Sequence, residues 1–476
     1  MPTSDDTKGN RRLPAALANT KHAENTLASA STLYTPENEK FDIPPPDGGT
    51  KAYLFMLTAF IIEAVMWGFP LTSSGVFTSY YNKQDNFASN AYIAVIGTLG
   101  TGIPFLGAPI ITPFCARFHR YQRQMIWTGW IMCMASLTAA SFSTTIWQLI
   151  ITQGLGYGAG FLILYYALLS MLNEWFVERR GLAYGALFAA AGLSGTGLPF
   201  LIDVCLNRFG YPLTLRGYAV AILVLVGPTL PFCRGRLPSP SNPQFSKIQF
   251  LSVFKNPIFY FFSLSNIFQG LAFYLPGLFL TIYAETLGIS PLNGVVLLCV
   301  LNLAMVVGQI ATGWLSDCAN IFILLLVSTL GSAVLGCVLW YIAKDMLYLI
   351  FFAILFGVFA GGYTVMYTRF CSACTDDPAT TLWLYGIFAF ERGIGIVAAG
   401  PLAAELLHFI DRKLHVEASP QGYRTLILFV GVCLLVSAVG SFGYFWRHRA
   451  LGLANKPCKI RPRKSQIRLQ AQAQTF

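Results

Sequence analysis

The chain has 476 residues, of which 55% are hydrophobic and 11% are charged, and its formal net charge is +11 at pH 7. About a quarter of the residues of a soluble globular domain are charged. The composition therefore excludes an ordinary soluble protein and favours one that uses the lipid bilayer as its solvent. The positive charge requires no nucleic-acid partner, because lysine and arginine gather in the segments that separate the apolar runs.

Apolar runs recur along the chain, and a helix needs roughly 20 such residues to cross a bilayer. Twelve runs meet this requirement: 52–79, 91–114, 124–142, 146–172, 181–206, 217–233, 257–284, 292–315, 321–342, 347–371, 382–407 and 424–446. We therefore expect an all-α integral membrane protein with twelve transmembrane helices.

The basic residues predict the topology of these helices. An even number of helices puts both termini on one side, and 24 of the 32 lysine and arginine residues lie on that side. Since basic residues accumulate in cytoplasmic loops, we expect both termini in the cytoplasm. We expect the plasma membrane as the location, with the vacuolar membrane as the alternative.

Polar segments flank and divide the helices. Residues 1–51 predict a disordered cytoplasmic tail, and 447–476 form a basic cytoplasmic tail. The longest internal polar stretch, 234–256, joins two six-helix halves, 52–233 and 257–446. This layout resembles the major facilitator superfamily, whose two halves rock around a site near the membrane midplane.

Two motifs make the resemblance more specific. PDGG at 46–49 precedes the first helix, and WFVERRGLAYGALFAAAG at 175–192 spans the start of the fifth. They resemble the two signatures of the monocarboxylate porter family and its fungal members, and RGIG at 392–395 resembles the eleventh helix of the fungal members. The resemblance implies a carrier that works by alternating access.

The second motif combines a charged triplet with a helix face made of small side chains. Glu178, Arg179 and Arg180 mark the expected cytoplasmic start of helix 5. They serve either topology and capping or a gate in which the arginines pair with an acid of another loop, such as Asp317. Small residues follow at spacings of four, four, three and four, so they share one face and predict close helix packing. These are Gly181, Gly185, Ala189, Gly192 and Thr196.

Charged residues inside helices are candidates for function. Glu63 lies in helix 1, and regular helical spacing puts Trp67, Pro70 and Ser74 on its face; Glu391 and Arg392 lie in helix 11. We expect Arg392 to bind an anionic substrate or to neutralise Glu63 across the cavity, with a structural ion pair as the alternative.

Uncharged polar residues extend this candidate cavity. Asn266 and Gln269 lie three residues apart on helix 7, and Asn302 and Gln309 share a face of helix 8. For each of them the alternative is a hydrogen bond that only joins helices. Four tyrosines are further candidates: Tyr165, Tyr166, Tyr363 and Tyr367.

The chain departs from the lactate and pyruvate carriers that it resembles. In those carriers a lysine follows the Phe-Pro of helix 1, where this chain has Leu71, and helix 8 carries an aspartate and an arginine, where this chain offers Asn302 and Gln309. Either Glu63, Glu391 and Arg392 have taken over the charge chemistry, or the substrate is larger and less charged.

The expected function is secondary-active transport of a small organic solute: monocarboxylate-like, vitamin-like or an exported secondary metabolite, with protons as the candidate coupling ion. The alternative is a transporter-like nutrient sensor, which usually has longer cytoplasmic extensions. We expect no enzyme and no cofactor, because the five histidines lack metal-ligand spacing and the chain has no Walker A phosphate loop.

Overall fold

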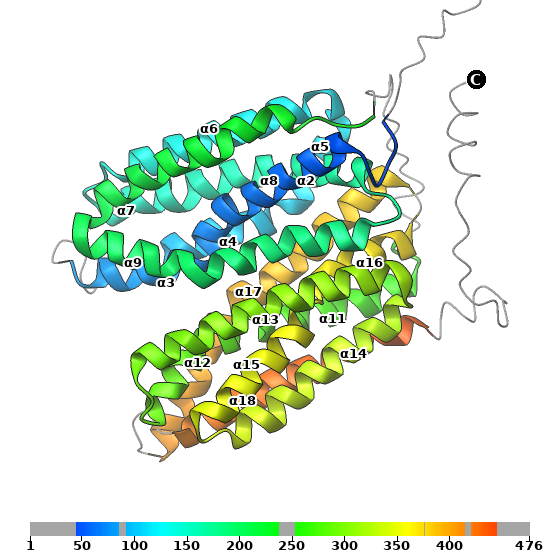
Figure 1. Cartoon of the computed structure of the whole chain (residues 1–476). Helices are drawn as coiled ribbons and strands as arrows, with labels where there is room; N and C mark the ends of the chain where they lie inside the picture. Colours follow the sequence, from blue (N-terminus) through cyan, green and yellow to red (C-terminus); the bar gives the residue numbers. More distant parts are fainter. Residues whose placement is uncertain (1–43, 85–91, 238–252, 376, 415–419, 445–476) are drawn as a thin grey trace, which may run out of the picture. The chain divides into compact units, whose positions relative to one another are not determined.

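The computed structural model describes residues 44–84, 92–237, 253–375, 377–414 and 420–444. Residues from Pro45 onward form one compact unit. Residues 1–43 of the expected N-terminal tail, the whole expected C-terminal tail, most of the linker, and the segments 85–91 and 415–419 lie outside the described residues. Helices are coloured along the chain in Figure 1, from blue at the start to orange near the end.

The N-terminal half comprises the helices from Thr50 to Phe232. In chain order these are α2 (Thr50–Ile62), η1 (Glu63–Trp67), α3 (Gly68–Asn82), α4 (Ile93–Leu106), α5 (Ala108–Arg117), η2 (His119–Tyr121), α6 (Gln122–Ala140), α7 (Ile146–Leu149), η3 (Ile150–Gly156), α8 (Tyr157–Trp175), α9 (Arg180–Val226) and η4 (Gly227–Phe232).

The C-terminal half comprises the helices from Pro257 to Phe442. In chain order these are α11 (Pro257–Phe273), α12 (Leu275–Thr286), α13 (Pro291–Cys318), α14 (Ile321–Val334), η5 (Leu335–Trp340), α15 (Met346–Gly361), η6 (Thr364–Met366), α16 (Tyr367–Cys374), α17 (Pro378–Leu414), α18 (Pro420–Ser437) and η7 (Ala438–Phe442).

The helices are long and apolar enough to span a membrane. Within the described ranges, nine spans meet the criteria of length and hydropathy, and the bent pair α4–α5 makes ten. The span Arg180–Phe232 contains two helices that meet at Gly210, whose φ of 75° interrupts the helical backbone. With α6, which also runs for 19 residues, the described chain accounts for the twelve expected helices.

A π-helical turn interrupts three of these spans, at η1, η3 and η5. A π turn holds more residues than an α turn, so the side chains on either side of it no longer follow one α-helical face. The face that sequence spacing assigned to Glu63, Trp67, Pro70 and Ser74 assumed a regular α-helix. Glu63 and Trp67 lie in η1, and Pro70 and Ser74 lie in α3, so the shared face stays a prediction.

The two halves meet closely where α9 crosses α13. A Cβ atom on Gly185 would lie 2.5 Å from the Gln309 carbonyl oxygen, and one on Gly313 would lie 2.6 Å from the Gly181 carbonyl oxygen. Only glycine permits backbones to approach this closely. In lipid the hydrophobic effect does not drive helices together, so the association of α9 with α13 depends on this close packing. The face of small side chains on the expected helix 5, which is the first part of α9, therefore lies against the other half of the protein.

The rest of that face contacts α13 as well. A Cβ on Gly192 would lie 2.9 Å from Val306 Cγ2, and the Cys299 thiol lies 3.4 Å from the Thr196 carbonyl oxygen. Ala189 is buried beside them. Small residues thus line α9 for about four turns of helix.

Candidate functional site

A carboxylate of one half caps a helix of the other. Asp317, at the end of α13, accepts hydrogen bonds from the backbone N–H groups of Gly181 at 2.8 Å and Leu182 at 2.9 Å, at the start of α9. The first N–H groups of a helix lack partners within the helix and carry its positive dipole end. Asp317 supplies both the acceptor and the negative charge.

The charged triplet does not pair with Asp317 through its side chains. In the part of the chain that the structure describes, no ion pair joins Asp317 to Arg179 or Arg180. Arg180 instead donates to the carbonyl oxygens of Asn173 and Phe176, each at 3.3 Å, and approaches the Ser372 hydroxyl of the other half at 3.5 Å. Asp317 is a partner of this segment, but through the backbone.

A second carboxylate binds the same loop. Asp47, in the PDGG motif, accepts hydrogen bonds from the backbone N–H groups of Val177, Glu178 and Arg179 at 2.9–3.0 Å. Its own N–H donates to the Trp175 carbonyl oxygen at 2.9 Å. The two motifs of the sequence resemblance are therefore joined directly by hydrogen bonds.

A polar cluster in the C-terminal half contains four of the expected site residues. Arg392, which is 1% exposed, donates through Nη1 to Gln269 Oε1 at 2.8 Å and to the Tyr367 hydroxyl at 3.1 Å. The Tyr367 hydroxyl donates to Asn266 Oδ1, and Asn266 Nδ2 lies 3.5 Å from Glu391 Oε2. Helices α11, α16 and α17 supply these groups.

Arg392 lies among uncharged partners. Its guanidinium carbon lies 4.7 Å from the centre of the Phe273 ring and 5.7 Å from that of Tyr274, and its buried Nε has no hydrogen-bond partner. Aromatic faces and neutral oxygens stabilise a cation only in part. No carboxylate lies within ion-pair distance of Arg392 in the described ranges, so its direct partners are all uncharged.

Glu63 is the corresponding buried charge of the N-terminal half. It is 0% exposed within η1, and neither carboxylate oxygen has a hydrogen-bond partner. The expected ion pair between Glu63 and Arg392 does not form in the described structure. Trp67, at the other end of η1, stacks on Phe161 at 5.0 Å between ring centres.

Aromatic rings connect the two buried charges. Tyr165 stacks with Trp67 at 6.3 Å and lies 5.4 Å from the ring of Tyr166, which lies 6.4 Å from that of Tyr385 in the other half. Tyr385 lies 6.1 Å from the ring of Tyr367, which holds Arg392. Tyr385 was missed by sequence reasoning, because tyrosine is common in this chain and nothing distinguishes it from the other 21.

Two expected site residues lie elsewhere. Asn302 Nδ2 donates to the Gly195 carbonyl oxygen at 3.3 Å, and Gln309, 9% exposed, lies near Gly192. Both belong to the contact between α9 and α13 and are separate from the Arg392 cluster. The Asn302 hydrogen bond joins two helices, which was the alternative interpretation, whereas Gln309 Oε1 is buried without a hydrogen-bond partner.

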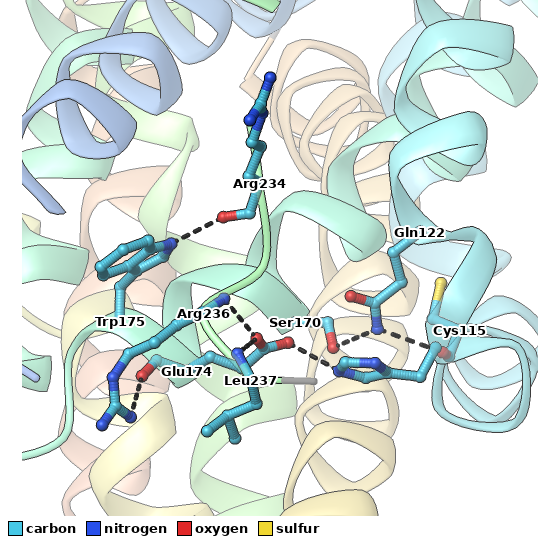
Figure 2. A network of polar contacts seen from close by, with 9 residues as sticks. Cys115, Gln122, Ser170, Glu174, Trp175, Arg234, Arg236 and Leu237 are labelled. Carbon is cyan, nitrogen blue, oxygen red and sulfur yellow. Dashed lines mark hydrogen bonds and ion pairs between the residues drawn. The ribbon is translucent and has the colours of Figure 1, made fainter. Parts of the chain in front are cut away.

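Sequence reasoning also missed a network at the end of α8, which Figure 2 shows. The Glu174 carboxylate accepts the N–H groups of Arg236 at 2.9 Å and Leu237 at 3.1 Å, and lies 2.8 Å from Nε2 of His119. The Trp175 indole N–H donates to the Arg234 carbonyl oxygen at 2.8 Å. Glu174 thereby attaches the first residues of the linker to the loop after α5.

The ion pair in this network changes a titration. The hydrogen bond to Glu174 and the attraction of its charge raise the pKa of His119 above 6.5, against the opposing effect of burial. A second layer adds Gln122, whose side-chain amide donates to the Ser170 hydroxyl at 2.8 Å and to the Cys115 carbonyl oxygen at 3.3 Å. Glu174, His119 and Gln122 lie outside the two motifs at 46–49 and 175–192, so neither motif could have indicated their role.

Comparisons with known proteins bear on the whole chain. The family model described as Major Facilitator Superfamily matches residues 54–389. An MFS transporter of Aspergillus flavus, asaE, is 26% identical over 392 residues, which cover 82% of this chain and 86% of that protein. The Fujikurins efflux protein of Gibberella fujikuroi is 26% identical over 415 residues, covering 84% and 83%.

Two further matches are more distant. Monocarboxylate transporter 13 of Bos taurus is 28% identical over 276 residues, covering 57% of this chain and 63% of that protein. The crystal structure of the human organic anion transporter MFSD10 (TETRAN) matches with a TM-score of 0.60 at 12% identity, covering 82% of this chain and 98% of that structure. The fold, the family model and the fungal relatives agree, and the chain belongs to the Major Facilitator Superfamily of membrane transporters.

Proposed function

We propose that this transporter moves a small organic acid by alternating access, with Arg392 as the residue that meets the acidic group of the solute. The observation that carries the proposal is a buried guanidinium with only neutral partners inside a membrane-spanning helix. An arginine keeps its charge at any physiological pH. An uncompensated cation at that depth costs free energy that an anionic solute recovers on binding.

The cluster around Arg392 also suits a partly apolar solute. Gln269 and Tyr367 hold the guanidinium in place, and the rings of Phe273 and Tyr274 flank it. Binding sites for organic molecules combine apolar walls with a few fixed polar groups. An acid attached to an apolar or conjugated body fits this composition better than lactate does.

Glu63 is the proposed proton carrier. A carboxylate without a partner is costly to bury as an anion, whereas a carboxylic acid is neutral. Glu63 therefore favours the protonated form while its surroundings are closed, and releases the proton when water reaches it. Aromatic rings run from Trp67 of η1 through Tyr165, Tyr166 and Tyr385 to Tyr367 beside Arg392, and we propose that this path couples the proton to the solute.

The contacts between the halves support one state of the transport cycle. On α17, a Cβ on Gly386 would lie 2.7 Å from Thr112 Oγ1 and one on Gly393 2.6 Å from Phe105 Cβ, whereas one on Gly400 would meet nothing within 4 Å. The contact of α17 with the N-terminal half is therefore tight at Gly386 and Gly393, toward the end of the protein where Asp317 lies, and it is absent at Gly400, toward the opposite end. With both termini in the cytoplasm, this is a carrier closed to the cytoplasm.

The names of the relatives suggest the direction of transport. The Fujikurins efflux protein and the Aspyridones efflux protein apdF of Emericella nidulans are both named as efflux proteins. We propose that this chain likewise exports an acidic secondary metabolite at a cell membrane. The names of those cargoes do not transfer at 23–26% identity.

A metabolite comparison tests the proposal. Cells with and without the gene are compared for acidic metabolites inside and outside, and each candidate is then tested in vesicles with an imposed pH gradient. We expect an acid that accumulates inside the deletion strain and whose vesicle transport follows the gradient. A cargo without an acidic group would contradict the role of Arg392, and transport indifferent to the gradient would contradict that of Glu63.

A further inference from the structure

The loop between α8 and α9 has its backbone amides divided between two carboxylates. Asp47 binds the N–H groups of Val177, Glu178 and Arg179. Asp317 binds those of Gly181 and Leu182. Five amides within six residues are therefore held by acids that lie far away in the sequence.

The two carboxylates differ in what they join. Asp47 lies directly before α2, so its bonds remain within the N-terminal half. Asp317 lies at the end of α13, so its bonds cross between the halves. If the halves separate at this end, the Asp317 bonds must break, whereas the Asp47 bonds need not change.

Asp47 adopts a conformation that only this arrangement explains. Its φ is +60°, and it is the one residue other than glycine with a positive φ in the described ranges. Aspartate tolerates this region better than most residues, but the conformation still costs free energy. Four hydrogen bonds between Asp47 and residues 175–179 offset that cost.

We propose that Asp47 is a positioning residue for the contact between the halves. It fixes the loop so that the amides of Gly181 and Leu182 face Asp317 whenever the halves close. The inference rests on the proposed alternating access, and it adds a component that stays assembled while Asp317 binds and releases. Asp47 also stabilises the loop in the open state, which keeps the amides ready for closure.

Hydrogen exchange of the full-length protein in lipid nanodiscs tests this inference, with single-amide resolution across 177–182. In Asp317→Asn, we expect the amides of Gly181 and Leu182 to exchange faster while those of 177–179 stay protected. In Asp47→Asn, we expect both sets to exchange faster, by about tenfold at Gly181 and Leu182, because a loop that Asp47 no longer fixes presents these amides to Asp317 less often.

The matched control is Glu178→Gln, which removes one negative charge, as Asp47→Asn does, but from the loop itself. Glu178 is exposed, and its side chain takes no part in the hydrogen bonds of the loop, so we expect the exchange rates of the loop to stay unchanged. Exchange across α8 away from the loop distinguishes a positioning role from general destabilisation, which would raise it too. If Asp47→Asn does not fold, Asp47→Glu, which keeps the charge, replaces it with the same readout.

The outcomes separate this inference from the proposed function. Unchanged protection of Gly181 and Leu182 in Asp47→Asn would overturn the positioning role. Asp317→Asn should also increase exchange at residues 380–390 of α17, which contact the other half. Unchanged exchange there would mean that Asp317 does not hold the halves together. The alternating-access proposal would then lack this contact as the one that closes the carrier. The role of Asp47 in the loop would be unaffected by that result.

Discussion

The two halves bury their charges in different ways. Glu63 lies in a π turn of the N-terminal half, without a hydrogen-bond partner and beside aromatic rings. Arg392 lies in a continuous helix of the C-terminal half and is held by Gln269 and Tyr367. A carboxylate can lose its charge by taking a proton, whereas an arginine cannot. The acid therefore suits proton exchange, and the arginine suits a solute that brings its own negative charge.

Removal of the fixed charge should have the largest effect on this comparison. In Arg392→Gln, we expect solute transport to fall by about 100-fold, because loss of one member of a buried charge pair costs roughly 3–5 kcal/mol. Vesicle uptake of the identified cargo measures the change, and immunoblotting checks abundance. Arg424→Gln is the control, since Arg424 is exposed and far along the chain from the cluster. Normal transport by Arg392→Gln would remove Arg392 from the solute site.

Neutralisation of the acid should have a smaller and different effect. In Glu63→Gln, the amide imitates the protonated acid but cannot release a proton, so we expect transport to become independent of the pH gradient and to slow by about tenfold. Uptake with and without the gradient measures this. Glu285→Gln, at an exposed position, controls for charge loss. Transport that still follows the gradient would assign proton coupling to another residue.

Loss of one neutral partner of Arg392 sharpens the comparison further. Tyr367→Phe removes the hydroxyl that contacts both Arg392 and Asn266. We expect the KM for the cargo to rise by about three- to tenfold with little change in the maximal rate, because Arg392 keeps its charge and its bond to Gln269 and loses one hydrogen bond that positions it, and a typical hydrogen bond contributes about 1 kcal/mol. Tyr348→Phe, which alters a 45% exposed tyrosine, should leave the KM unchanged. An altered maximal rate with the same KM would indicate a role in the conformational change.

A third acid, Glu174, has a hydrogen-bond and ion-pair partner, His119, whereas Glu63 has none. Loss of this pair should have the smallest effect of the four changes. Since the hydrogen bond to Glu174 raises the pKa of His119 above 6.5, this pair stabilises the folded chain fully below pH 6.5 and loses its effect as pH rises through the raised pKa. In His119→Gln, we expect the free energy of unfolding to fall by about 1 kcal/mol or less at low pH and to stay the same at high pH. Melting temperatures between about pH 5.5 and 8.5 measure it. A loss of stability equal at all pH values would contradict the ion pair.

The sequence predicted much of the candidate site but not its geometry. Asn266, Gln269, Glu391 and Arg392 were selected because polar groups inside membrane helices are rare, and they form one cluster. That selection rested on the cost of burying each group separately, which sequence reveals. It could not distinguish a cavity from a helix contact, and so Asn302, which bonds to Gly195, was placed with the cluster.

Two pairings that the sequence left open are absent from the described structure. A pairing of Glu63 with Arg392 was one of two interpretations of the buried arginine, and a pairing of Arg179 or Arg180 with Asp317 in one state of a gate was one of two interpretations of the charged triplet. Which atoms approach one another depends on the relative positions of helices, which a single sequence does not encode locally. In the structure, Asp317 accepts hydrogen bonds from backbone amides of α9, and Arg392 donates hydrogen bonds to neutral groups.

By itself, the sequence determined the membrane as solvent, the twelve helices and the family, because apolar length, charge distribution and motifs are properties of the chain read in order. Only the tertiary structure decided that the two motifs form one unit through Asp47, that α9 lies against α13, and that Glu63 has no partner. Hydrogen bonds and close packing between distant segments depend on three-dimensional distances, and these exist only once the helices have assembled.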